Sequence, residues 1–417
     1  MALLKLNLVI LSYVFVVGCT ATSPYRSAEG KDCTVISYKE LTAHEKCSNI
    51  EKKNDNNKFD LGIVEFSDQG MMYERKQFDN VLQLVKAESE KDLEIVVYVH
   101  GWKHSADFED KNFRKFQKDI MPNFVREGTR TVGLYVGWRG KVLKTSPVLQ
   151  SITFYDRKNA ADKVAKGSVR ELFSYLSAYR NNELSKPGRK VKLTIIGHSF
   201  GGLIIYNSLA EVLMNSVVEA NLKNPQTPRN AKPIADLILL LNPAFEASRF
   251  EPLFQAAKDK LKKNGDWLYD AKQQPILISI TSEADLATKY AFPVVRTLNS
   301  IFEQESQIDE DVEAGSAYWN RIEKIANTRT VGHIERYRTH MLDFDSELKE
   351  DYSNVEKYVS CLTFDNKFIV QNNQFPLWNI YATKNVIPGH DNIYEKPLWS
   401  FISKIAEVES AGKDICK

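Results

Sequence analysis

The sequence predicts an α/β protein built around a mostly parallel β-sheet with helices on both faces. Short, continuously apolar runs alternate with segments of helical periodicity, and this alternation is typical of parallel sheets that are covered on both sides. The composition is that of a globular chain, because 43% of the 417 residues are hydrophobic and 26% are charged. At about 150 residues per domain, the length alone would allow two or three domains.

Six apolar runs are expected to form strands of this sheet. They cover residues 93–99, 131–138, 191–196, 237–241, 276–281 and 378–383. Helices are expected over residues 202–214 and 397–408, and a third follows from the helical spacing of Val169, Leu172, Phe173, Leu176 and Tyr179. Two long connections, residues 141–162 and 299–365, are expected to be insertions, which in such folds often cover the functional site.

The overall charge and hydropathy exclude two classes of protein. Fifty-six Lys and Arg residues against 54 Asp and Glu residues leave a net charge of +2, with no basic patch for nucleic acid. A mean hydropathy of −0.36 excludes a polytopic membrane protein. The sequence contains neither a dinucleotide-binding nor a phosphate-binding glycine motif, and no Cys/His spacing that favours zinc, so we expect no cofactor and no metal.

The N-terminus has the pattern of a secretory signal peptide over residues 1–18. Lys5 precedes an apolar run of 13 residues, which is shorter than the roughly 20 residues that a transmembrane helix needs. The run ends in VVGC at residues 16–19, and this resembles the bacterial lipobox. The resemblance implies cleavage before Cys19 and lipidation of Cys19, and Thr20 favours the outer membrane. A short membrane anchor or a buried, uncleaved helix is the alternative.

Five cysteines are present in the chain. If Cys19 carries lipid, four remain, and export to an oxidising compartment favours two disulfides. The pairing Cys33–Cys47 with Cys361–Cys416 closes the shorter loops and is preferred among the three possible pairings. Four free thiols are expected instead if the protein stays in the cytosol.

Residues 197–201 (GHSFG) match the pattern G-x-S-x-G directly between an expected strand and an expected helix. In such a turn the serine sits in a strained conformation, so its neighbours two positions away must lack side chains. Ser199 is therefore the candidate nucleophile. A second element is HGW at residues 100–102, which follows the strand at 93–99.

These motifs resemble those of the α/β-hydrolase superfamily of the lipase and esterase type. The matching segments are VVYVHGW (96–102) and TIIGHSFGG (194–202), together with the late acid and histidine described below. The resemblance implies that the amides of Trp102 and Phe200 form the oxyanion hole. We expect His100 to brace this loop. The expected domain organisation is a signal peptide at 1–18, a tether and small element at 19–60, and one catalytic domain at 61–417 with the two insertions.

The acid that orients the catalytic histidine is expected after a strand that follows the serine. Asp285 is preferred, because the family places one strand between the serine strand and the strand that precedes the acid. Glu283 and Glu246 are the reserves. An N-cap role is the alternative for Asp285.

The base is expected later in the chain, between the last strand and the last helix. His390 lies there, in VIPGHD at residues 386–391, and Pro388 and Gly389 form a turn that can aim its ring. His340 and His333 are the alternatives, and both could instead line the substrate pocket.

The sequence thus predicts a membrane-anchored serine hydrolase with the triad Ser199, Asp285 and His390. Small-molecule or lipid esters are the expected substrates, and amides, thioesters or acyl transfer are open alternatives with the same triad. A catalytically inactive surface lipoprotein that uses the hydrolase scaffold for binding is the second class of function. The expected location is the bacterial cell envelope, with lipid on Cys19 holding the membrane.

Overall fold

The structure is a computed structural model that describes most of residues 22–407. The ranges it leaves out within these limits are 36–37, 43, 54–57, 88–90, 141–146, 223–229, 259–261, 264–265, 268, 271, 294–324, 345–359 and 364–373. The expected signal peptide, Cys19 and Cys416 lie outside the described residues.

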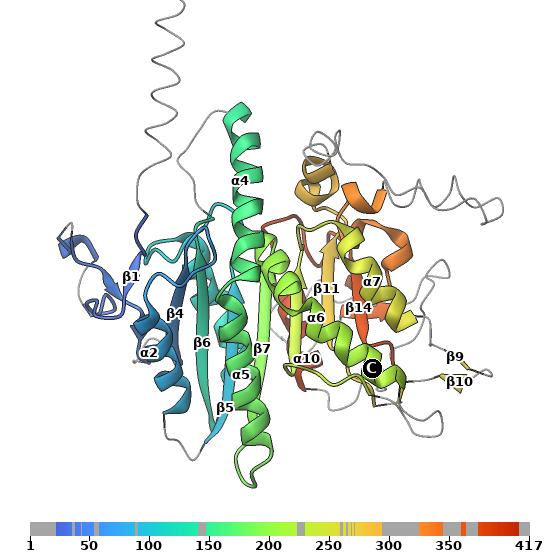
Figure 1. Cartoon of the computed structure of the whole chain (residues 1–417), viewed down its shortest axis with the longest axis horizontal. Coiled ribbons are helices and arrows are strands. Elements are labelled where there is room, and N and C mark those ends of the chain that lie inside the picture. Colours follow the sequence, from blue (N-terminus) through green and yellow to red (C-terminus); the bar gives the residue numbers. More distant parts are fainter. Residues whose placement is uncertain are drawn as a thin grey trace, which may run out of the picture.

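A ten-stranded sheet forms the centre of the described chain (Figure 1). Its order is β13-β12-β14-β11-β8-β7-β5-β6-β4-β3. The strands are β3 (Ile50–Glu51), β4 (Asp60–Phe66), β5 (Asp92–Val99), β6 (Thr129–Trp138), β7 (Val191–His198), β8 (Leu237–Leu241), β11 (Leu277–Ser282), β12 (His340–Phe344), β13 (Ser360–Thr363) and β14 (Leu377–Ala382). Neighbours from β4 to β12 run parallel, and only β3 and β13 pair antiparallel at the two edges.

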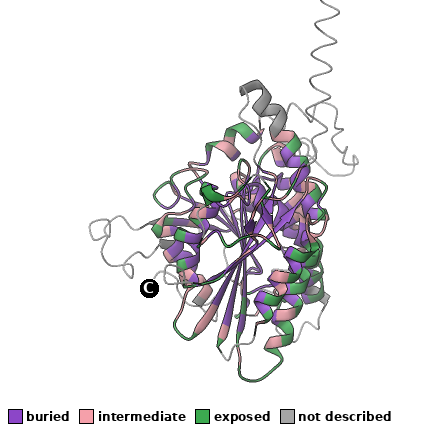
Figure 2. Ribbon diagram, turned by 90° about the vertical axis from the view of Figure 1, so that its left-hand side faces the viewer, coloured by how far each residue is buried: buried purple, intermediate pink, exposed green. Residues whose placement is uncertain are grey.

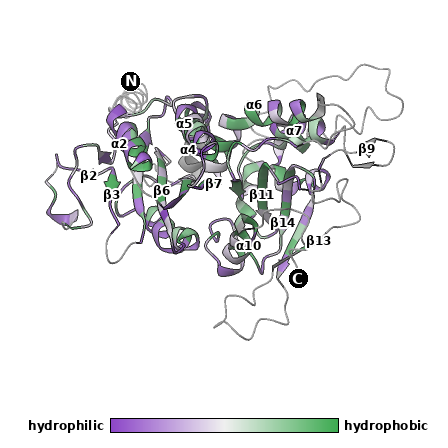
Figure 3. Cartoon of the chain, turned by 90° about the horizontal axis from the view of Figure 1, so that it is seen from below, coloured by the Kyte–Doolittle hydropathy of each residue, from purple (hydrophilic) through white to green (hydrophobic). Residues whose placement is uncertain are grey.

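Helices cover both faces of this sheet, as Figure 3 shows from below. The α-helices are α2 (Arg75–Lys86), α3 (Lys111–Lys115), α4 (Pro147–Lys166), α5 (Val169–Leu184), α6 (Phe200–Leu222), α7 (Ala247–Lys258) and α10 (Lys396–Glu407). Short helical turns are η1 (Tyr38–Glu40), η2 (Phe116–Ile120), η3 (Met121–Phe124), η4 (Ala287–Ala291), η6 (Val331–His333) and η7 (Glu335–Tyr337). The predicted fold class is therefore confirmed: a mostly parallel sheet lies between two helical layers.

The core is divided by the sheet into two apolar clusters. One joins the sheet to α2, α4, α5, α6 and α7, and the other joins its opposite face to α3, η2, η3 and α10. The strands are buried along almost their whole length, whereas the outer faces of the helices are exposed (Figure 2). This double coverage explains why the strand sequences are continuously apolar instead of alternating.

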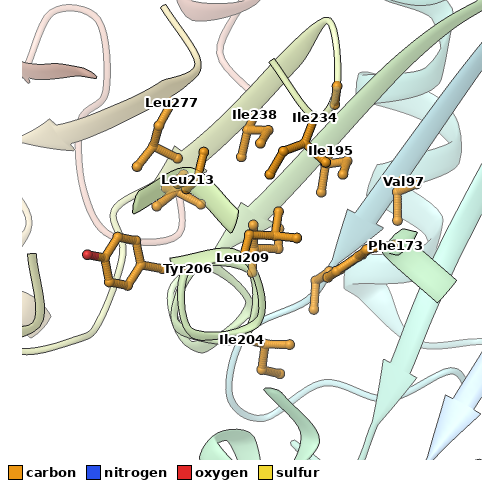
Figure 4. Packing of buried hydrophobic residues seen from close by; sticks show 14 of the residues in the cluster. Val97, Phe173, Ile195, Ile204, Tyr206, Leu209, Leu213, Ile234, Ile238 and Leu277 are labelled. Atoms are coloured by element: carbon orange, nitrogen blue, oxygen red, sulfur yellow. The ribbon is translucent and has the colours of Figure 1, made fainter. Parts of the chain in front are cut away.

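Helix α6 is the central helix of the larger cluster. Leu209 points toward Ile195 on β7, and Ile204 points to the other side of the helix (Figure 4). By length and composition the stretch Phe200–Ala220 could cross a membrane, with a mean hydropathy of 1.2, but 61% of it is buried within the protein. Its apolar character is therefore explained by packing in the core.

The described N-terminal segment packs against the domain. Two short parallel strands, β1 (Arg26–Ser27) and β2 (Cys47–Ser48), pair with each other, and β3 joins the edge of the main sheet. Arg26 is fully buried, with its Nη1 2.9 Å from Glu51 Oε1. The predicted Cys33–Cys47 disulfide is present and closes a separation of 14 residues. The side chain of Cys361 and all of Cys416 lie outside the described part, so the second pairing stays a prediction.

Several elements differ from the sequence prediction. All six predicted strands form, but β4, α2 and α7 had no counterpart among the expected elements. The expected insertion at 141–162 contains most of helix α4, and the described part of 299–365 adds β12 and β13 to the sheet. A minor hairpin, β9 (Lys262–Lys263) with β10 (Asp266–Trp267), lies outside the main sheet.

Candidate active site

Ser199 occupies the sharp turn between β7 and α6. Its φ of 55° lies in the left-handed region that a residue with a side chain rarely adopts. Two backbone hydrogen bonds hold this turn, one from Ser199 N–H to the carbonyl of Leu241 (3.0 Å) and one from Ala244 N–H to the carbonyl of Ser199 (3.1 Å). The end of β8 therefore fixes the conformation of the serine backbone.

The glycines on either side of Ser199 are required by close backbone approach. A Cβ on Gly201 would lie 1.9 Å from the carbonyl oxygen of Val99, and a Cβ on Gly197 would lie 2.7 Å from the backbone of Gly201. Both distances are shorter than any real Cβ contact, so larger residues would displace the backbone of the turn. The steric argument made from the sequence thus applies at both positions.

The three predicted triad residues lie in one hydrogen-bonded row. His390 Nε2 is 2.9 Å from Ser199 Oγ, and His390 Nδ1 is 2.9 Å from Asp285 Oδ2. Asp285 is fully buried and Ser199 is 6% exposed. Asp285 comes from the loop after β11 and His390 from the loop after β14, so the carboxyl ends of parallel strands bring them together.

Asp285 is held by Thr288 and, through it, by His333. Thr288 donates to both carboxylate oxygens of Asp285, from its N–H to Oδ1 at 2.9 Å and from its hydroxyl to Oδ2 at 2.5 Å. The Thr288 hydroxyl oxygen in turn accepts from His333 Nε2 at 2.9 Å. His333 is therefore a support for the acid instead of the base, and Thr288 was not among the residues singled out from the sequence.

The loop that carries His390 is held through its backbone. His198 Nε2 donates to the carbonyl oxygen of His390 at 2.9 Å, and Asn242 Nδ2 donates to the same oxygen at 2.9 Å. Asn242 also accepts from Ser282 N–H, which ties this loop to the end of β11. His198 and Asn242 were missed from the sequence, although His198 belongs to the G-x-S-x-G motif itself.

The electrostatics of the row favour a charged acid and a basic histidine. Burial alone lowers the pKa of His390, but the hydrogen bond and charge of Asp285 outweigh burial and raise it above its usual value. Burial alone raises the pKa of Asp285, but the hydrogen bond and charge of His390 keep it below its usual value. Burial, together with the charge of His390, lowers the pKa of His198 to about 3, so His198 is neutral at neutral pH.

The remaining acid and base candidates lie elsewhere. Glu246 is buried with its Oε1 2.8 Å from Lys158 Nζ, and Glu283 accepts from the N–H of Lys384. His340 is buried on β12, with Nδ1 2.8 Å from the hydroxyl of Thr339. The places of base and acid beside Ser199 are instead taken by His390 and Asp285.

A cavity opens beside Ser199, and its volume of about 420 Å³ is within the usual range of small-molecule sites. Its walls are mainly apolar, and its lining includes Trp102, Phe154, Phe200, Ala244, Ala287, Ala291 and Phe292. Phe154 comes from α4, and its ring lies 5.0 Å from the ring of Phe200. The segment expected as an insertion therefore contributes a wall of the cavity.

The two predicted oxyanion-hole residues both line this cavity. Among the described residues, no acceptor pairs with the amide N–H of Trp102 or of Phe200. His100 braces the loop before Trp102, because its Nε2 accepts from Trp138 N–H at 3.2 Å and its Nδ1 lies 2.8 Å from the carbonyl oxygen of Gly101. The expected bracing role of His100 matches these contacts.

In the described part of the chain, one group has the spacing of metal ligands. Ligand atoms of His198, His390 and Asp391 lie within 4.8 Å of one another. Both ring nitrogens of His390 are already engaged with Ser199 and Asp285, and His198 Nε2 is engaged with the His390 carbonyl. These contacts fit a proton-transfer row better than a metal site.

No protein-family model matches this sequence, and no curated protein matches it either. Similar solved structures include phospholipase PlaB from Legionella pneumophila in complex with thio-NAD, with 12% identity and a TM-score of 0.32 over 76% of this chain and 59% of that chain. An acyl-protein thioesterase from Zea mays has 12% identity and a TM-score of 0.24, over 75% of this chain and 94% of that chain. A siderophore hydrolase from Aspergillus nidulans has 13% identity and a TM-score of 0.27, over 76% and 83%. The match thus spans 59% of the length of the phospholipase. Structural similarity at these TM-scores does not identify an activity.

Proposed function

We propose that this protein is a membrane-anchored serine hydrolase that cleaves carboxylic esters. The observation that carries the proposal is the row Ser199–His390–Asp285, with 2.9 Å at each contact, beside an apolar cavity. A serine hydroxyl is a weak nucleophile at neutral pH, and a histidine oriented by a carboxylate makes it reactive.

Each residue of the site has a defined role in this reaction. Ser199 Oγ attacks the ester carbonyl carbon while His390 Nε2 takes its proton, and Asp285 stabilises the imidazolium that forms. The amides of Phe200 and Trp102 donate to the oxyanion, which is usually the largest electrostatic contribution to such catalysis. His390 then protonates the leaving alcohol, and water releases the acyl group from Ser199 by the same steps.

The cavity suggests an apolar acyl group. Aromatic and alanine side chains provide most of its surface, whereas Lys103, His104 and Asp391 supply polar groups. Amides and thioesters use the same machinery, so a matched panel of butyrate and octanoate esters, thioesters and amides tests the class of substrate. We expect kcat/KM to be highest for the esters and to increase with acyl length.

The anchor is the second part of the proposal. The VVGC sequence at residues 16–19 supports cleavage and lipidation at Cys19, and several acyl chains provide durable attachment at about 0.8 kcal/mol per buried CH₂. The Cys33–Cys47 disulfide is consistent with an oxidising envelope compartment. The expected location is the outer membrane. Mass spectrometry should detect acyl chains on Cys19, and Cys19→Ala should be lost from the membrane fraction.

Labelling with a fluorophosphonate tests the nucleophile. We expect Ser199→Ala to lose labelling completely. Ser208→Ala is the matched control, because Ser208 is also a buried serine but lies within α6 and donates to the carbonyl of Ile204. If wild-type protein fails to label while it remains folded, the alternative of a non-catalytic binding scaffold is favoured instead.

A further inference from the structure

The described chain begins at Thr22, and its first residues lie at the carboxyl edge of the sheet. Thr22 Oγ1 lies 2.7 Å from the hydroxyl of Tyr73, and Glu65 Oε2 accepts from Tyr25 N–H at 2.9 Å. A hollow of about 250 Å³ there is lined by Thr22, Ser23, Pro24, Tyr25, Glu65, Phe66, Tyr73, Trp138 and Arg139. Phe66 and Trp138 are the last residues of β4 and β6, so the first described residues lie at the edge where these strands end.

The candidate active site lies at this same edge. The ring of Trp138 is 6.4 Å from the ring of Phe200, which lines the cavity beside Ser199. Cys19 precedes Thr22 by only three residues. Since an extended residue spans at most about 3.6 Å, a lipid on Cys19 would hold this edge within about 11 Å of its attachment point.

Three exposed apolar side chains lie on the loops of this edge. Met71 on the loop after β4 is 64% exposed, and Leu286 and Tyr290 after β11 are 63% and 59% exposed. Five strand spacings separate β4 from β11 in the sheet order, or about 24 Å at 4.8 Å each. These side chains are therefore spread across a broad face.

Two further features suit this face to a lipid surface. Helix α4 projects beyond the carboxyl ends of the strands (Figure 1). Lys103 Nζ lies 4.5 Å from the centre of the Trp102 ring, and Lys289 Nζ lies 5.6 Å from that of Tyr290. Lysine beside aromatic rings is typical of the membrane–water interface, where the apolar stem is buried and the charge stays hydrated.

We infer that the carboxyl edge of the sheet, which we call the catalytic face, docks on the lipid bilayer that holds the anchor. The face is defined by Met71, Lys103, Leu286, Tyr290 and the N-terminal end of α4. The cavity beside Ser199 then opens toward the bilayer, and the substrate class is an ester whose acyl chain resides in the membrane. This inference rests on the proposed anchor at Cys19 and extends the proposed function to substrates taken directly from lipid.

Energy transfer tests the orientation without requiring activity. The full-length, lipidated protein is reconstituted into vesicles that contain headgroup-dansylated lipid, and transfer from an added tryptophan is measured against the parent protein. Leu286→Trp and Met71→Trp report on the catalytic face. Leu184→Trp is the control, because Leu184 is 49% exposed and ends α5 shortly before the amino end of β7. The eight residues of β7 separate the two edges by about 26 Å.

We expect the two catalytic-face positions to transfer at least twofold more efficiently than Leu184→Trp. Equal or reversed efficiencies in protein whose acylation is verified by mass would overturn the orientation, while leaving the hydrolase and the anchor intact. Absence of an acyl group on Cys19 would overturn both the anchor and this inference. Neither result depends on whether Ser199 is reactive, so the failures are distinguishable.

A kinetic comparison tests the substrate class. In lipidated protein, Met71→Ser combined with Leu286→Ser is expected to lower hydrolysis of a vesicle-resident long-chain ester at least fivefold. Hydrolysis of a water-soluble butyrate ester should stay unchanged, and Leu184→Ser should change neither rate. Equal loss on both substrates, or loss on neither, would contradict the docking role of these side chains.

Discussion

The left-handed backbone of Ser199 predicts that glycine is better tolerated there than alanine. At a φ of 55° a side chain costs about 1–2 kcal/mol relative to glycine, because its Cβ approaches the following carbonyl. Glycine loses about 0.4–1 kcal/mol through the greater freedom of the unfolded chain. Both Ser199→Gly and Ser199→Ala lose the hydroxyl contact to His390, so that contribution cancels. We therefore expect Ser199→Gly to be more stable than Ser199→Ala by about 1 kcal/mol, and both to be inactive.

The assay is urea unfolding of the two variants under identical conditions, with fluorophosphonate labelling to verify the loss of reactivity. Ala210→Gly provides a control of opposite sign, because Ala210 lies inside α6 and glycine there costs about 1 kcal/mol. If Ser199→Gly is as stable as Ser199→Ala, or less stable, the turn does not store the conformational strain that φ implies.

Three further predictions follow from the charges and the disulfide. Asp285→Asn should lower kcat by about 10⁴-fold, and should lower the pKa of His390 in the pH–rate profile, because it removes the charge that raises this pKa. Burial raises the pKa of Glu94 from 4.5 to about 7, so the folded state binds more protons than the unfolded state between these values. The contribution of Glu94 to stability should therefore fall by up to about 3 kcal/mol from pH 4.5 to pH 7, measured as the change over this range in the difference in urea unfolding between the wild type and Glu94→Gln. Loss of the Cys33–Cys47 disulfide by Cys33→Ser with Cys47→Ser should cost about 3 kcal/mol in urea unfolding, given its separation of 14 residues.

The elements that could be read from the sequence are those with a continuous apolar pattern. Strands such as β5 and β7 were predicted because both of their faces are covered, so almost every residue is buried and the runs are mainly apolar. Strand β4 was missed because DLGIVEF contains Gly62 and Glu65 among its apolar residues. Glu65 is buried, and its carboxylate accepts from the N–H groups of Tyr25 and Arg26, which precede it by 40 and 39 residues in the sequence.

Some residues of the site were predicted from the sequence, whereas others were identified only in the structure. Asp285 and His390 were named from the order of strands and candidate residues along the chain. Thr288, Asn242 and His198 were not, because each acts through a hydrogen bond that no local pattern specifies. His333, retained as a possible base, lies behind Asp285, since its ring contacts the Thr288 hydroxyl instead of Ser199.

The sequence by itself determined the strand–turn–helix around Ser199. The requirement is local and steric, since Gly197 and Gly201 are needed wherever a serine is held in this turn. The motif can therefore be recognised within one short segment of the sequence. Only the tertiary structure decided which histidine meets the serine, because His390 lies 191 residues away and reaches Ser199 through the packing of separate strand ends. It also decided that the N-terminal segment and the cavity share one edge, since the direction of parallel strands places both there.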